Sequence, residues 1–132
     1  MAQENTAKDA KRILVCDDDT SVVSFLTLFL KKEGFGEVDV ASCAKEALEK
    51  IIKERYALIL LDIRLPDMDG MQVLARIKEI NSNIDVIMIT GYPEMETAQA
   101  SVKLGAYDYI VKPFDINYIK LAVLTKLLLN VK

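Results

Sequence analysis

The chain has 132 residues, of which 52% are hydrophobic and 28% are charged, and its formal net charge at pH 7 is −3. This is the length of one domain whose core needs no disulfide or structural metal to fold. Lysines and arginines alternate with acids along the chain, so the sequence offers no basic surface for direct nucleic-acid binding. Because the chain contains no histidine, histidine metal sites and phosphotransfer through histidine are excluded on it.

Residues 1–11 are predicted to be a flexible N-terminal segment and residues 12–132 to form the folded domain. The N-terminus lacks the charged-then-apolar pattern of a secretion signal, and no apolar run reaches the length of a bilayer span. We therefore expect a cytoplasmic chain that makes no membrane contact. Cys16 and Cys43 do not have the spacing of a metal or redox pair and are expected to be reduced packing residues.

Four short apolar runs predict strands that are covered on both faces, as in a parallel sheet. They are Ile13–Cys16, Leu58–Leu61, Val86–Ile89 and Tyr109–Val111. A weaker candidate strand, Val38–Ala41, follows a glycine-rich turn signal and is expected at the edge of the sheet.

Helical patterns lie between and after these strands. Their apolar stripes run over Val22–Leu30, Ala44–Ile52, Met71–Ile77, Met95–Leu104 and Ile116–Val131. Strict alternation of strands and helices with short connections predicts an α/β fold, a doubly wound five-stranded parallel sheet of the (βα)5 type. The spacing does not give the strand order, although the flavodoxin-like order is a common outcome for five such units.

Residues that carry chemistry follow the predicted strands. Asp17 and Asp18 follow the first strand, Asp62 ends the third, Thr90 follows the fourth and Lys112 the fifth. Ligands of parallel α/β sheets bind outside the carboxyl ends of the strands. If the first, third, fourth and fifth strands are neighbours, these side chains meet at one rim.

Three carboxylates and one ammonium at that rim leave an excess of negative charge that a divalent cation would cancel. Two carboxylates about 4 Å apart repel by about 4 kcal/mol at an effective dielectric constant of about 20, so such a cluster raises a pKa or recruits a cation. Oxygen ligands without nitrogen or sulfur favour Mg²⁺, which keeps water positions open for a phosphate. We expect Asp62 to attack a phosphoryl group whose oxygens contact Lys112 and the Thr90 hydroxyl.

Together, these separated motifs resemble the receiver domain of a two-component response regulator, from about Lys11 to the last helix. The resemblance implies that Asp62 is the phosphoacceptor and that Lys112 pairs with the phosphoryl group. The implied ligands of Mg²⁺ are Asp17, Asp18, Asp62 and the backbone carbonyl of Arg64. The Lys112–Pro113 bond matches a bond that is commonly cis in this family.

The resemblance also implies a switch in which Thr90 and Tyr109 move on phosphorylation and change the surface of helix 4, strand 5 and helix 5. A sensor histidine kinase or phosphotransfer protein is the implied partner. A homodimer through that surface and an output domain outside this chain are further expectations. The expected chemistry is self-phosphorylation and self-dephosphorylation, so the chain is not expected to be an enzyme acting on a separate substrate.

Simpler interpretations stay open for single residues. Asp19 is better explained as a helix N-cap, and Asp67 and Asp69 as turn residues, than as metal ligands. Taken alone, Lys112 would be a solvated charge and Tyr109 a half-buried strand aromatic.

Two other functions also stay open. A phosphohydrolase with an aspartyl-phosphate intermediate would have a second aspartate where Arg64 lies. An interaction module whose acids are vestigial would not bind Mg²⁺.

Overall fold

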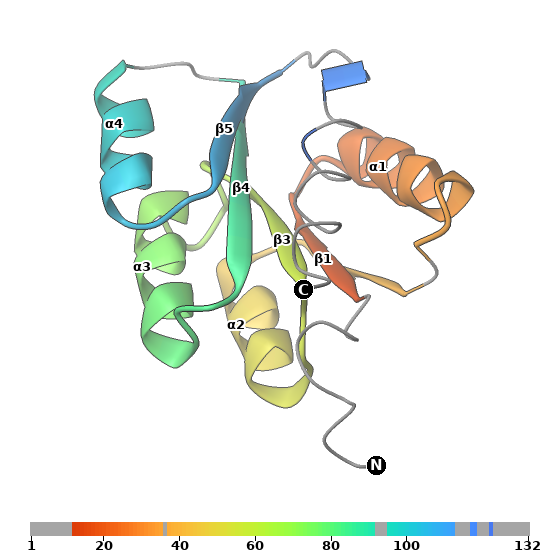
Figure 1. Ribbon diagram of the computed structural model, residues 1–132, viewed down its shortest axis with the longest axis horizontal. Helices are drawn as coiled ribbons and strands as arrows, with labels where there is room; N and C mark the ends of the chain where they lie inside the picture. The colour runs from red at the N-terminus through yellow and green to blue at the C-terminus, as the bar shows by residue number, and fades with distance from the viewer. Residues whose placement is uncertain (1–11, 36, 92–94, 113–116, 119–121, 123–132) are drawn as a thin grey trace.

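The computed structural model describes residues 12–35, 37–91, 95–112, 117–118 and 122 (Figure 1). The strands are β1 (Ile13–Cys16), β2 (Val38–Ala41), β3 (Leu58–Asp62), β4 (Asp85–Thr90) and β5 (Asp108–Val111). The helices in this described part are α1 (Thr20–Lys32), α2 (Ala44–Lys53), α3 (Gly70–Ile80) and α4 (Met95–Lys103).

The five strands form one parallel sheet in the order β2-β1-β3-β4-β5. This confirms the predicted doubly wound α/β fold, and it confirms that Val38–Ala41 forms an edge strand. The order also makes β1, β3, β4 and β5 consecutive neighbours, which was the condition for a common rim.

Each strand supplies side chains to two cores, because successive residues of a strand point to opposite faces of the sheet. In β1 and β3, Leu14, Cys16, Ile59 and Leu61 pack into the core covered by α2 and α3. The alternate residues Ile13, Val15, Leu58 and Leu60 pack against Leu26, Phe29 and Leu30 of α1. Figure 1 shows the same division, with α1 on one face of the sheet and α2, α3 and α4 on the other. With both faces covered, the edges and ends of the strands remain for a site.

Helix caps account for several boundaries. Asp19 is the N-cap of α1, where its carboxylate accepts hydrogen bonds from the backbone of Ser21 and Val22, as the sequence predicted. Asp69 caps α3 in the same way by accepting from the N–H of Met71. Gly105 follows α4 with a φ of 102°, a conformation that favours glycine at a helix end.

Three predictions fall wholly or largely outside the described residues. These are the flexible segment 1–11, the conformation of the Lys112–Pro113 bond, and most of the helix expected over Ile116–Val131. Of that helix, residues 117, 118 and 122 are described and are helical. Among the described helices, none has the length and apolar character needed to cross a bilayer.

Candidate functional site: an acidic rim beside one lysine

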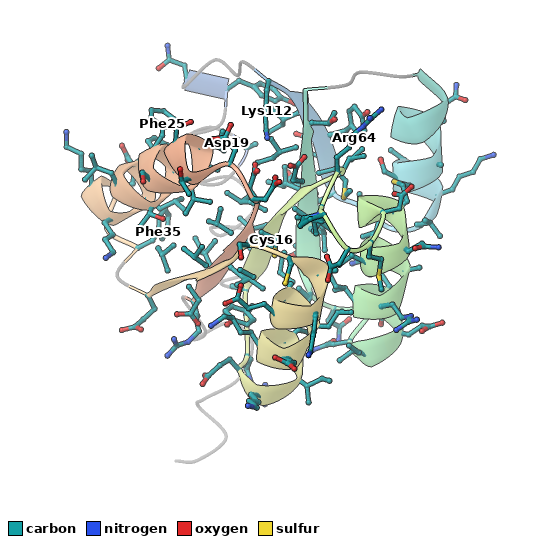
Figure 2. All side chains as sticks on the ribbon, turned by 180° about the vertical axis from the view of Figure 1, so that it is seen from behind. Cys16, Asp19, Phe25, Phe35, Arg64 and Lys112 are labelled. Carbon is teal, nitrogen blue, oxygen red and sulfur yellow. The ribbon has the colours of Figure 1, made fainter. Side chains whose placement is uncertain are left out.

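Four neighbouring strand ends bring the predicted site residues together. Asp17 directly follows β1, Asp62 and Thr90 are the last residues of β3 and β4, and Lys112 directly follows β5. The register explains this, since Cys16 pairs with Leu61, Asp62 with Ile89, and Thr90 with Val111. In Figure 2, Lys112 and Arg64 lie at this same end of the sheet.

Three carboxylates form a cluster at this rim. One oxygen from each of Asp17, Asp18 and Asp62 can be chosen so that all three lie within 4.8 Å of one another. Asp17 and Asp62 are buried, whereas Asp18 is exposed. A cluster with two buried acids and one exposed acid is open to solvent on one side, and its donor set of carboxylate oxygens suits a hard cation such as Mg²⁺.

Lys112 supplies the positive charge of the rim. Its Nζ donates a hydrogen bond to Asp17 Oδ2 at 2.7 Å and lies 3.6 Å from Asp62 Oδ2. Burial opposes the charged form of the ammonium, but the hydrogen bond to Asp17 and the negative charges of both acids outweigh burial and raise the pKa of Lys112. The lysine therefore remains charged at neutral pH.

The surroundings of the Asp62 carboxyl at this rim disfavour its charged form. Burial, followed by repulsion from the Asp17 carboxylate, raises the pKa of Asp62 to about 6. Lys112 and the hydrogen bond donated by the Arg64 N–H to Asp62 Oδ1, at 3.3 Å, act in the opposite direction. One ammonium thus does not fully compensate the buried acids, and a further positive charge is favoured here.

The backbone that follows Asp62 is tightly folded. The Gly70 N–H donates to the Ile63 carbonyl at 2.6 Å. A Cβ atom added at Gly70 would lie 2.5 Å from the Asp62 carbonyl oxygen and 2.6 Å from the Ile63 Cα. Glycine is therefore required where α3 begins. No periodic pattern in the sequence indicates this close approach of Gly70 to the backbone of Asp62 and Ile63.

Thr90 and Tyr109, the two predicted switch residues, lie on adjacent strands. Thr90 is fully buried at the end of β4, and its carbonyl accepts a hydrogen bond from the Lys112 N–H at 2.6 Å. Tyr109 is half-buried in β5, pairs with Met88 of β4, and packs against the core on the α2 and α3 face. Their position beside the rim is established, and their movement on phosphorylation stays a prediction.

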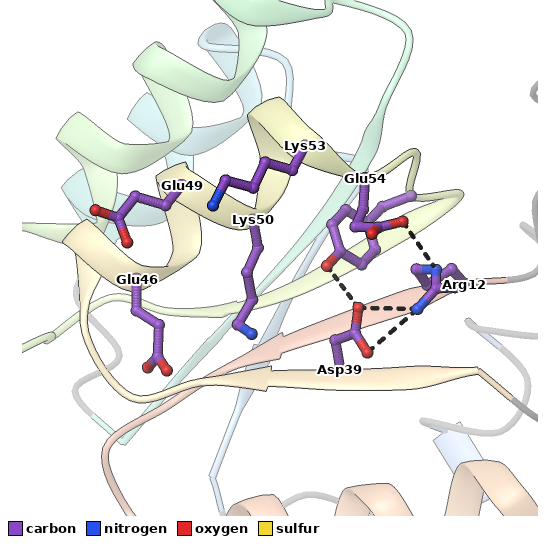
Figure 3. A pocket seen from close by; sticks show the side chains of 8 residues that line it. Arg12, Asp39, Glu46, Glu49, Lys50, Lys53 and Glu54 are labelled. Carbon is purple, nitrogen blue, oxygen red and sulfur yellow. Dashed lines mark hydrogen bonds and ion pairs between the residues drawn. The ribbon is translucent and has the colours of Figure 1, made fainter.

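A second group of charges lies apart from this rim, beside α2 and the β2 edge of the sheet. A pocket of about 460 Å³ lies there (Figure 3). At this pocket, Arg12 Nη1 lies 3.2 Å from Asp39 Oδ2 and Arg12 Nε lies 3.7 Å from Glu54 Oε1. The Tyr56 hydroxyl also donates to Asp39 at 2.7 Å. None of the predicted site residues lines this pocket.

Comparisons with known proteins agree with the fold and with the resemblance. The family model of the response regulator receiver domain matches residues 13–124. The chain is 41% identical over 113 residues to sporulation initiation phosphotransferase F of Bacillus subtilis, covering 86% of this chain and 90% of that protein. It is 39% identical to the transcriptional regulatory protein ZraR of Klebsiella oxytoca, covering 84% of this chain but 25% of that longer protein.

Solved structures give the same result. A CheY-like response regulator receiver domain protein from Methanospirillum hungatei has a TM-score of 0.87 and 37% identity, covering 92% of this chain and 97% of the other. The beryllofluoride-activated NtrC4 receiver domain dimer has a TM-score of 0.85 and 36% identity, covering 91% of this chain and 98% of the other. The chain belongs to the response regulator receiver domain family.

Proposed function

We propose that the chain is a phosphorylation-controlled signalling module in which Asp62 accepts a phosphoryl group, with Mg²⁺ present, from a sensor histidine kinase or phosphotransfer protein. The observation that carries the proposal is the convergence of the carboxylates of Asp17, Asp18 and Asp62, with the Lys112 ammonium beside the first and the last of them. A cytoplasmic location and a receiver domain that spans residues 12–132, after a flexible segment 1–11, are part of the same proposal.

The residues present fit a magnesium site. Asp17, Asp18, Asp62 and the backbone carbonyl of Arg64 would hold the ion, as carboxylate and carbonyl oxygens are the ligands that Mg²⁺ prefers. The bound ion would supply positive charge to the carboxylates and to the phosphoryl oxygens. This charge is what the buried acids lack, as the raised pKa of Asp62 indicates.

The proposed transfer uses the Asp62 carboxylate as the nucleophile. One Asp62 oxygen forms a bond to phosphorus while the bond between phosphorus and the imidazole nitrogen of a phosphohistidine breaks. The imidazole leaves with the electron pair of that bond. Lys112 Nζ, 3.6 Å from Asp62 Oδ2, would neutralise one phosphoryl oxygen, and the Thr90 hydroxyl would donate to another. Hydrolysis of the acyl phosphate by water later releases inorganic phosphate and restores the Asp62 carboxylate.

The proposed output of this reaction is a change of surface. Thr90 and Tyr109 would move toward the phosphoryl group and shift the surface that includes α4 and β5 between two states. One relative in this family is described as an activated receiver domain dimer, which supports a homodimer as one consequence of the switch. Several relatives are longer transcriptional regulatory proteins, so we also propose a separate output domain as a target of the switch.

The proposal is tested by phosphorylation with a small donor. The purified chain is treated with acetyl phosphate or phosphoramidate and Mg²⁺, and its intact mass is measured. We expect the mass of one phosphoryl group to be added, and we expect no addition to Asp62→Asn or in the presence of a chelator. No addition to the unmodified chain, or addition that persists in Asp62→Asn, would overturn the proposal.

The same samples separate the two other functions. Multiple-turnover release of phosphate from phosphomonoesters would indicate a phosphohydrolase. An absence of any response to Mg²⁺ in the unmodified chain would indicate an interaction module with vestigial acids.

A further inference from the structure

The N-terminus of α2 is capped by a residue from another part of the chain. The first N–H groups of a helix lack partners within the helix, and the N-cap residue Cys43 provides no side-chain hydrogen bond to them. Instead, Ala44 N–H donates to Asp67 Oδ1 at 2.8 Å and Lys45 N–H donates to Asp67 Oδ2 at 3.0 Å. Both carboxylate oxygens are therefore used by a helix that begins 23 residues earlier in the sequence.

This contact suits an ionised carboxylate. The hydrogen bonds from the Ala44 and Lys45 N–H groups lower the pKa of Asp67, so that it is charged at neutral pH. Negative charge is favoured at a helix N-terminus because the N–H dipoles there point outward. Asp67 thus binds the end of α2 in the protonation state in which it binds best.

Asp67 lies at the tip of the loop that joins β3 to α3. The base of this loop is closed by the hydrogen bond from Gly70 N–H to the Ile63 carbonyl and by an antiparallel bridge between Arg64 and Asp69. The Asp67 carboxylate connects the tip to α2. The loop of residues 63–69 is therefore held in place both at its base and at its tip.

The same loop reaches the phosphoacceptor. The Arg64 N–H donates to Asp62 Oδ1 at 3.3 Å, and the Arg64 carbonyl is a predicted ligand of the metal. A displaced loop would change the orientation of the Asp62 carboxylate and move that carbonyl. From this geometry we infer that Asp67 is a positioning residue, which holds the backbone beside Asp62 in place by anchoring the loop tip to α2.

The alternative is that Asp67 stabilises α2 and has no effect on the rim. The chain offers a matched control, because Glu46 also supplies hydrogen-bond acceptors at this helix end. Glu46 Oε1 accepts from the N–H of Ser42 at 2.8 Å and from its hydroxyl at 3.3 Å, and Glu46 does not contact the β3–α3 loop in the hydrogen bonds described. Asp67→Ala and Glu46→Ala therefore both weaken the start of α2, but only the first releases the loop.

The first measurement requires neither metal nor phosphorylation. Amide hydrogen exchange is followed by NMR at Arg64 and Gly70 in metal-free protein, with circular dichroism as a check of folding. We expect Asp67→Ala to accelerate exchange at both amides about tenfold more than Glu46→Ala does. Asp67→Asn keeps one oxygen acceptor and should lie between the unmodified chain and Asp67→Ala. Equal exchange in Asp67→Ala and Glu46→Ala would overturn the inference.

The second measurement concerns the site, and here the inference rests on the proposed function. Mg²⁺ affinity and the rate of phosphorylation by phosphoramidate are measured for the same variants. Asp67→Ala should weaken Mg²⁺ binding by about 10-fold, the lower end of what removal of groups that orient metal ligands commonly costs, while Glu46→Ala should leave it unchanged. Equal Mg²⁺ affinity in both variants would contradict the positioning role. Absence of Mg²⁺ binding by the unmodified chain would instead contradict the proposed function and leave the exchange result to decide the inference.

Discussion

Two clusters of charge in this molecule have the same formal composition and different surroundings. At the rim, Lys112 accompanies Asp17, Asp18 and Asp62; beside α2, Arg12 accompanies Glu37, Asp39 and Glu54. Counted this way, each has one cation and three carboxylates, and Glu46, Glu49, Lys50 and Lys53 also line the pocket beside Arg12. The side chains of Asp17 and Asp62 are 3% and 8% exposed, whereas those of Glu37 and Glu54 are 64% and 49% exposed.

Burial therefore separates the two clusters more clearly than charge does. Water solvates the excess negative charge around Arg12, so that network can tie β1 to β2 and to the α2–β3 connection as a structural element. At the rim, water reaches fewer of the acids. Their negative charge is therefore incompletely stabilised, and the pKa of Asp62 is raised. The same types of residue thus form a structural network in one place and the proposed cation site in the other.

The largest expected effect is a loss of stability at the Arg12 cluster. Asp39→Ala removes the charged acceptor of part-buried hydrogen bonds from Arg12 and from the Tyr56 hydroxyl. We expect it to destabilise the fold by about 2 kcal/mol, since hydrogen bonds to a charged group contribute more than neutral ones. Urea unfolding of the variant and the unmodified chain measures this difference. Tyr56→Phe is the control, because removing that hydroxyl should recover part of the loss in the double variant. An unchanged midpoint for Asp39→Ala would show that this cluster is not a structural network.

At the rim, by contrast, we expect a substitution to increase the stability of the fold. Asp62→Asn removes a carboxylate that is destabilised by burial and by Asp17, so in metal-free buffer at pH 7 it should stabilise the fold by about 1 to 2 kcal/mol. Since the pKa of about 6 in the folded state exceeds the value of 3.8 for a solvated aspartate, the native state binds more protons than the unfolded state between these two pH values. The contribution of Asp62 to stability is therefore present at low pH and is lost as the pH rises through about 6.

Urea unfolding across this pH range measures that contribution. The advantage of Asp62→Asn over the unmodified chain should be small near pH 4 and should grow to its full size by pH 7. A variant that is less stable than the unmodified chain at pH 7 would contradict the view that Asp62 is a destabilised carboxylate.

A smaller effect is expected from Mg²⁺ itself. A cation that binds the folded state raises its stability by mass action, by about 1.4 kcal/mol at ten times the dissociation constant. Asp18→Ala, which removes an exposed proposed ligand without opening the core, should reduce this gain, whereas Glu37→Gln at the other cluster should leave it intact. Thermal unfolding with and without Mg²⁺ measures both. The comparison between the clusters fails if Glu37→Gln reduces the gain as much as Asp18→Ala does.

The sequence predicts the rim well because strand ends are local features. Each of Asp62, Thr90 and Lys112 lies at or just after the end of a run of apolar residues, and parallel strands place such ends at one edge of the sheet. The contact between Lys112 and Asp17 spans 95 residues, and this rule predicts it only once β1, β3, β4 and β5 are known to be neighbours.

Other contacts depend on packing that leaves no periodic signal. The order β2-β1-β3-β4-β5 could not be derived from spacing, because helical connections of similar length allow a strand to be added at either edge. Asp67 was assigned to a turn, and its contact with Ala44 arises only when α2 and the β3–α3 loop pack side by side. The ion pairs of Arg12 could not be predicted, because a charged surface residue has many possible partners in a sequence.

Paramagnetic broadening by Mn²⁺, a substitute for Mg²⁺ at oxygen sites, tests most directly whether the buried rim is the cation site. Amide signals are recorded by NMR while Mn²⁺ is added below one equivalent. If the rim binds the cation, the signals of Asp18, Asp62 and Arg64 disappear first, and those of Arg12, Asp39 and Glu54 remain. Broadening that begins at the Arg12 cluster, or that affects both clusters equally, would contradict it.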